Sequence, residues 1–182
     1  LVQLHCPPSE ICGKKETYEM MDEIVKKGKI NYYGVSVEKV SEALDAIKCP
    51  NVKSIQIIFN VFRQKPSEIF FKEAKKNNVA IIARVPLASG LLTGKMNSQS
   101  SFPENDHRNY NINGDAFDVG ETFSGINFAK GLEAVEELKK IKPSDFSLTD
   151  LSLKWILSYP EVTVVIPGAK NRTQAELNAK AS

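Results

Sequence analysis

The sequence contains few cysteines, no long apolar run and no recognisable secretory leader. Its cysteines (Cys6, Cys12 and Cys49) are odd in number and lack CxxC spacing, so they indicate reduced thiols and a cytoplasmic protein rather than a disulfide framework. No apolar stretch approaches the ~20 residues that a membrane-spanning helix needs. We therefore expect a protein that does not cross a membrane.

Long basic stretches and metal-ligand patterns are also missing. Lys and Arg number 24 against 22 Asp and Glu, giving a formal net charge of +2, which gives no reason to expect a nucleic-acid or membrane-surface partner. Neither His5 nor His107 has a Cys or carboxylate at ligand spacing, so no metal site is expected. Residues 90–95 (GLLTGK) lack the four-residue gap and the following Ser or Thr of a phosphate loop.

What the sequence does contain is an alternation of strand-like and helical periods. Strands are predicted over residues 1–5, 30–36, 54–60, 80–85 and 162–166. Helices are predicted over 16–27, 40–47, 67–77 and 128–141, and a further one begins at Ser147, where Asp150 completes a capping box. Residues 88–127 show no periodicity and are predicted to form one long loop, which we expect to lie over the ligand site because long ordered loops are usually functional.

Strands that alternate with helices favour parallel strands joined by right-handed crossovers. We predict an α/β fold: a partial (β/α)8 TIM barrel with about five parallel strands, in which residues 1–182 are the C-terminal portion of a single barrel domain. A full barrel takes ~250 residues, and five strands alone would leave two exposed sheet edges. A self-contained doubly wound sheet is the alternative architecture.

Polar residues lie at the ends of four of the predicted strands. In a barrel, active sites form at the carboxyl ends of the strands. The polar residues are His5, Ser36, Gln56 with Asn60, and Arg84. A polar residue at one strand end can simply meet water. The same pattern at four strands in concert favours a ligand site.

The last predicted strand leads into a basic turn. Gly168, Lys170 and Arg172 follow the strand, and Thr173 with Glu176 fits a helix capping box. Free N–H groups at a helix start, together with two cations, suit an anion such as phosphate. A solvated basic turn before a helix is the alternative.

Several stretches, in this order along the chain, resemble the aldo-keto reductase family. They are Gln3–Pro7, Gly28–Ser36, Gln56–Asn60, Ala83–Lys95 and Val165–Lys170. This family comprises NADPH-dependent carbonyl reductases built on a βα barrel. The Pro-Leu-Ala-Ser-Gly and Pro-Gly-Ala-Lys forms are most similar to the bacterial-type and potassium-channel β-subunit-like branches.

The resemblance implies a role for each matching position. His5 matches the active-site histidine that orients the substrate carbonyl. The cofactor-binding positions are Ser36 and Gln56 (nicotinamide carboxamide), Pro86, Leu87, Ser89 and Gly90 (pyrophosphate), Gly168, Lys170 and Arg172 (2′-phosphate region), and Gln174 and Asn178 (adenine). The implied cofactor is NADPH, and the implied partner is a small carbonyl substrate.

The chain departs from the family pattern at three places. Val37 stands where many members have an asparagine, and Arg84 stands where many place an aromatic ring against the nicotinamide; an arginine plane can also stack there. The family's catalytic Asp, Tyr and Lys lie upstream of its histidine strand, and no matching residues occur here. We therefore expect the parent protein, and not the chain alone, to reduce aldehydes or ketones by hydride transfer.

Two other interpretations remain open. The parent could be a non-catalytic regulatory subunit that binds NADPH through the same site, or the chain could pair with another chain that supplies the remaining strands. The oligomeric state and the carbonyl substrate cannot be derived from these residues.

Overall fold

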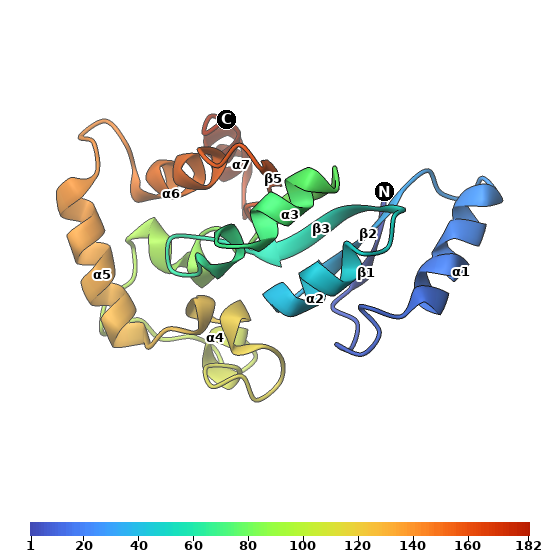
Figure 1. The fold of residues 1–182 in the computed structure, drawn as a ribbon. Coiled ribbons are helices and arrows are strands. Elements are labelled where there is room, and N and C mark those ends of the chain that lie inside the picture. Colours follow the sequence, from blue (N-terminus) through green and yellow to red (C-terminus); the bar gives the residue numbers. More distant parts are fainter. The chain divides into compact units, whose positions relative to one another are not determined.

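The computed structural model describes residues 1–182. Five strands form one parallel sheet in chain order: β1 (Val2–His5), β2 (Tyr33–Val37), β3 (Val52–Ile58), β4 (Ala80–Arg84) and β5 (Val162–Val165) (Figure 1). The α-helices are α1 (Lys15–Lys26), α2 (Val40–Ala46), α3 (Phe70–Lys76), α4 (His107–Tyr110), α5 (Phe128–Ile141), α6 (Leu148–Leu157) and α7 (Arg172–Ala179). This confirms the predicted α/β fold with five parallel strands; the sheet does not close into a barrel.

The chain divides into two compact units. Unit 1 comprises residues 1–57, 64–83 and 160–164, and therefore holds most of the sheet with α1, α2 and α3. Unit 2 comprises residues 58–63, 84–159 and 165–182, including α4 to α7. No helix in either unit combines the length and the apolar character that crossing a bilayer demands.

The strands and helices of unit 1 follow the predicted order, but two strands begin at other residues than predicted. Gly28 follows α1 with a φ of 69°, the left-handed conformation in which glycine ends helices without strain. The predicted strand at 30–36 begins only at Tyr33, and the strand predicted from residue 54 begins earlier, at Val52. In the pairing of β2 with β3, Tyr33 lies opposite Val52 but the next residue, Gly34, lies opposite Ser54. This register irregularity cannot be predicted from the alternation of apolar and polar side chains along one strand.

Unit 2 has its own apolar core between α5, α6 and the 3-10 helix η2 (Ala88–Thr93). Fully or nearly fully buried members are Ala88, Leu91, Leu92, Phe123, Val135 and Leu148. The capping box predicted for α6 is confirmed: the Ser147 side chain accepts from Asp150 N at 3.0 Å, and Ser147 N donates to the Asp150 carboxylate at 2.9 Å.

Two local predictions in unit 2 are wrong. Residues 88–127 are not a structureless loop: they contain η2, α4 and two further 3-10 helices, η3 (Val119–Glu121) and η4 (Phe123–Gly125). These elements are each too short to show a helical period. The cap of α7 is Asn171 rather than Thr173, since the Asn171 side chain accepts from Gln174 N at 2.9 Å while Glu176 pairs with Arg172.

Candidate functional site

Three predicted site residues stand side by side at the carboxyl ends of β1, β2 and β3. The strand register pairs His5 with Ser36 and Ser36 with Gln56. Ser36 is fully buried, whereas His5 is exposed. The sheet of unit 1 thus brings one histidine, one hydroxyl and one amide into a row.

A second polar row lies one pleat below, and Gly34 makes it possible. The register places Gly34 between Gln3 and Ser54, and the Gln3 amide reaches across β2 to donate to Ser54 Oγ at 3.2 Å. Gln3 Oε1 also accepts from Gln56 Nε2 at 2.6 Å. A Cβ at Gly34 would overlap Ser54, so the glycine leaves space for the hydrogen bonds that Gln3 makes across β2. These hydrogen bonds in turn fix the position of the Gln56 amide.

Cys6 supports Ser36, a contact that sequence reasoning missed. Cys6 has a φ of 42°, its N–H donates to the Ser36 carbonyl at 3.0 Å, and its Sγ lies 3.6 Å from Ser36 Oγ. The left-handed turn after His5 therefore bends the chain back over the end of β2. The sequence signal available was only the position of Cys6 before two prolines.

The other thiol of this region is not a nucleophile. Burial, together with the nearby Glu42 and Asp45 carboxylates, raises the pKa of the Cys12 thiol to about 11. The thiol of Cys12 therefore stays protonated at neutral pH and behaves as a small apolar group.

In unit 2, the segment after β4 has a strained backbone. Val85, Ala88 and Ser89 have φ values of 51°, 46° and 56°, and a left-handed β-branched residue such as Val85 is a true outlier. The facing segment is similar, with Phe123 and Ser124 at 50° and 62°. Such strain persists only where surrounding contacts impose it, and it concentrates at functional sites.

Two side chains join these strained segments to each other. Asn60, fully buried, donates from Nδ2 to the Val85 carbonyl at 2.9 Å and to Ser124 Oγ at 2.7 Å. Ser89 Oγ donates to the Glu121 carbonyl at 2.8 Å and accepts from Phe123 N at 3.1 Å. Asn60 was a candidate for the ligand site, but its amide is committed to backbone and hydroxyl partners, so it serves as a structural link.

Two arginine–carboxylate pairs hold the turn at residues 118–121. Arg84, the last residue of β4, pairs with Glu121, and their side chains are 7% and 21% exposed. Arg63 Nη1 lies 3.1 Å from Asp118 Oδ1. The sequence prediction singled out Arg84 but not Glu121, because Glu121 lies in the stretch without periodicity.

The remaining predicted residues of unit 2 lie in the segment 86–90 and around the start of α7. Pro86 is buried, Leu87 packs against the apolar core, and Gly90 has a φ of 95°. Gly168, Lys170 and Arg172 are exposed, and Gln174 and Asn178 are partly buried.

Local hydrogen bonds organise the basic turn. Lys170 N donates to Gln174 Oε1 at 2.7 Å, and Asn178 Nδ2 donates to the Gly168 carbonyl at 3.1 Å. Arg172 Nε contacts Glu176 Oε1 at 2.6 Å. The Lys170 ammonium has no such acidic neighbour, so it is the cation of this turn most available to an anion.

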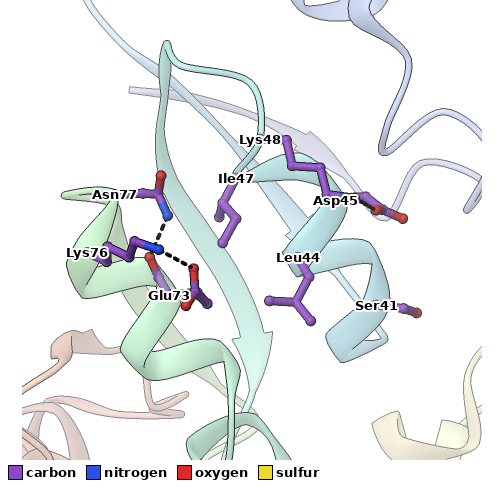
Figure 2. A pocket seen from close by; sticks show the side chains of 8 residues that line it. All are labelled: Ser41, Leu44, Asp45, Ile47, Lys48, Glu73, Lys76 and Asn77. Carbon is purple, nitrogen blue, oxygen red and sulfur yellow. Dashed lines mark hydrogen bonds and ion pairs between the residues drawn. The ribbon is translucent and has the colours of Figure 1, made fainter.

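A groove of unit 1 lies elsewhere, between α2 and α3 (Figure 2). It encloses about 570 Å³ and is lined by Ser41, Leu44, Asp45, Ile47, Lys48, Glu73, Lys76 and Asn77. Its charges are paired between residues close in sequence: Lys48 lies 2.7 Å from Asp45, and Lys76 lies 3.8 Å from Glu73. None of the predicted site residues borders this groove.

Comparison with known proteins gives a consistent result. The model of the Aldo/keto reductase family matches residues 1–182. "Aldo-keto reductase YhdN" of Bacillus subtilis is 30% identical over 179 residues, covering 97% of this chain and 51% of that protein. "Aldo-keto reductase yakc [NADP(+)]" of Schizosaccharomyces pombe is 30% identical over 158 residues, covering 85% and 44%.

Relatives of another kind also match. A "Probable voltage-gated potassium channel subunit beta" of Arabidopsis thaliana is 29% identical over 181 residues, covering 92% of this chain and 51% of that protein. Among solved structures, the apo form of aldo-keto reductase AKR11C1 from Bacillus halodurans superposes with a TM-score of 0.70 at 25% identity, covering 98% of this chain and 54% of that one. The chain spans about half the length of the proteins it matches.

Proposed function

The chain belongs to the aldo/keto reductase family, and from this premise we propose that it forms the cofactor-binding part of an oxidoreductase that reduces aldehydes or ketones with NADPH. The cofactor, when bound, would supply a hydride to the carbonyl carbon, and the carbonyl oxygen would take a proton. The family's Asp, Tyr and Lys have no counterparts within residues 1–182, so the chain by itself is proposed to be inactive.

The observation that carries this proposal is the row formed by His5, Ser36 and Gln56 at adjacent strand ends. An exposed imidazole suits a hydrogen bond to a substrate carbonyl oxygen. The buried hydroxyl of Ser36 and the Gln56 amide, each fixed by a neighbour at 3.6 and 2.6 Å, suit the carboxamide of nicotinamide, which both donates and accepts hydrogen bonds.

The resemblance to the family assigns further cofactor contacts within unit 2. Arg84 would lie against the nicotinamide ring, and residues 86–90 would follow the pyrophosphate. Lys170 and Arg172 would contact the 2′-phosphate, with Gln174 and Asn178 near the adenine. The segment 88–127 would cover the cofactor, and the hydrogen bonds of Ser89 with residues 121 and 123 hold the two ends of this segment together.

Substitution of Lys170 tests the cofactor assignment in the intact protein. We expect Lys170→Ala to weaken NADPH binding about tenfold, equivalent to ~1.4 kcal/mol, and to leave NADH binding nearly unchanged, because only NADPH carries the 2′-phosphate. Arg172→Ala should have a smaller effect, since Glu176 already pairs with Arg172. Lys130→Ala, at an exposed position on α5, is the control. Equal losses for both cofactors would refute the phosphate contact.

A second candidate function is a regulatory subunit that binds NADPH without useful turnover. The match to a probable potassium channel β subunit favours it. Turnover of a panel of aldehydes by the intact protein separates the two functions: steady NADPH consumption supports the reductase, whereas tight NADPH binding without consumption supports the regulatory subunit.

A further inference from the structure

We infer that His107 is a pH-responsive brace that fastens the middle of the segment 88–127 to its start when the imidazole is protonated. The imidazole lies between two oxygen atoms of unit 2. Its Nε2 is 3.4 Å from Ser89 Oγ, and its Nδ1 is 3.6 Å from Asp106 Oδ1. The side chain is 38% exposed, so it exchanges protons with solvent. This device needs no cofactor, and it therefore goes beyond the proposed function.

The hydroxyl group of Ser89 can only accept a hydrogen bond from the imidazole. Its proton is donated to the Glu121 carbonyl at 2.8 Å, and one of its lone pairs accepts from Phe123 N at 3.1 Å. A serine hydroxyl has one proton and two lone pairs, so the group that remains for His107 Nε2 is a lone pair. That nitrogen must therefore carry a proton to bond to Ser89.

The second ring nitrogen faces a carboxylate oxygen, which is also an acceptor. A neutral imidazole has only one N–H group, so with the proton on Nε2 the lone pair of Nδ1 is repelled by Asp106 Oδ1. Hydrogen bonds from Arg108 hold the pKa of the Asp106 carboxyl below its usual range, so this oxygen stays negative. The imidazolium ion has two N–H groups and donates to both Ser89 and Asp106, and only this form completes the brace.

His107 is the one side chain of unit 2 whose type ordinarily titrates between about pH 5 and 8. Unit 2 has no second histidine and no cysteine. The Phe117 ring, whose centroid lies 6.4 Å from that of the imidazole, carries no charge, and η2 has no titratable side chain. The carboxylates of the turn at residues 118–121, Asp118 and Glu121, are each in an ion pair with an arginine. A structural change of this segment between pH 5 and 8 therefore reports on His107.

The direction of the pH effect follows from the hydrogen bonds. Because the protonated form makes both contacts, the brace is present at the acid end of this range and is lost as the pH rises. Two backbone amides report on it directly. Phe123 N donates to the Ser89 hydroxyl, and Asn111 N donates to the His107 carbonyl at 2.9 Å.

Amide hydrogen exchange of the intact protein between pH 5.5 and 8 tests the brace, with each rate corrected for the intrinsic pH dependence of exchange. We expect the protection of the Phe123 and Asn111 amides to fall about threefold as the pH rises, as for a partly exposed charged contact. Protection along α5, in the same unit, should not change with pH. No change at Phe123 and Asn111, or an equal change along α5, would overturn the inference.

Two histidine variants assign the effect to its residue. His107→Gln keeps a side-chain N–H for Ser89 but cannot change its charge, so protection at Phe123 should become independent of pH. His5→Gln is the matched control, because it replaces the other histidine of the chain, in unit 1, and it should leave the threefold change intact. A pH dependence that persists in His107→Gln, or that disappears in His5→Gln, would overturn the inference.

Asp106→Asn keeps the test decisive if His107→Gln does not fold. The asparagine oxygen can still cap α4, but the negative charge that favours the imidazolium ion is gone. Little pH dependence should then remain at Phe123. An undiminished pH dependence in Asp106→Asn would overturn the inference.

Discussion

Replacing Asn60 by alanine should destabilise unit 2 more than any exposed substitution. The Asn60 amide is fully buried and makes four hydrogen bonds, to the Val85 carbonyl and Ser124 Oγ as donor and from the N–H groups of Phe62 and Arg63 as acceptor, at 2.7 to 3.2 Å. A buried polar group that loses its partner costs about 1–3 kcal/mol.

Two of the four groups that bond to the Asn60 amide keep another hydrogen bond after the substitution. The Val85 carbonyl still accepts from Ala88 N at 3.1 Å, and Arg63 N still donates to the carbonyl of residue 60 at 3.0 Å. Two groups, Ser124 Oγ and Phe62 N, then account for most of the loss, and the truncated side chain leaves a small cavity. We expect the free energy of unfolding to fall by about 3 kcal/mol.

Urea unfolding followed by circular dichroism measures this loss. Asn77→Ala is the control: the Asn77 amide is exposed and makes one local bond, to the Glu73 carbonyl at 2.8 Å, so its effect should stay within about 0.5 kcal/mol. Ser124→Ala added to Asn60→Ala should cost less than the sum of both changes, because they share a contact. Similar losses for Asn60→Ala and Asn77→Ala, or strict additivity with Ser124→Ala, would refute the argument that Asn60 links the two strained segments.

Two further predictions concern stability. Gly34→Ala should cost about 1–3 kcal/mol, because its Cβ would overlap the neighbouring strand. Gly168→Ala is the control, because no atom lies within 4 Å of the added carbon, and it should leave the melting temperature nearly unchanged. Thermal unfolding of both variants measures the difference, and equal changes in melting temperature would contradict the packing argument. Hydrogen bonds and ion pairing with Arg108 hold the pKa of Asp106 below its usual range, so the stability that this carboxylate contributes is present above about pH 4 and is lost as pH falls further. Asp106→Asn keeps a capping oxygen but loses the charge-assisted hydrogen bonds to Arg108, so it should cost about 1 kcal/mol at pH 7. The difference from the unsubstituted protein should shrink below pH 4, and a difference that stays constant with pH would contradict this role of the charge.

Hydrophobic periodicity was enough to locate the five strands and the longer helices of this fold, but not the short helices within residues 88–127. The pattern over residues 128–141 predicts α5 with its bounds, and Ser147 with Asp150 predicts the start of α6. Both rest on local chemistry, namely an apolar stripe and a reciprocal cap. The register irregularity between Tyr33 and Gly34 depends on the pairing of β2 with β3, which no local pattern encodes.

The site was predictable in part. Alternation along the strands predicts that Ser36 and Gln56 lie toward the carboxyl ends of two strands, and the register then places them side by side. Glu121 and Ser124 were not predictable, since their positions depend on left-handed backbone at residues 85, 88–90 and 123–125. The only trace of that backbone in the sequence is a Ser-Gly pair in each segment, at residues 89–90 and 124–125, a common turn signal.

Amide hydrogen exchange of the intact protein with and without NADPH tests the central claim most directly. If the proposed cofactor contacts are correct, NADPH should slow exchange at Ser36 and Gln56 within unit 1, and at residues 84–90 and 168–174 within unit 2. The groove between α2 and α3 (Figure 2) should be unaffected. Protection confined to that groove, or no protection at all with saturating NADPH, would contradict the account.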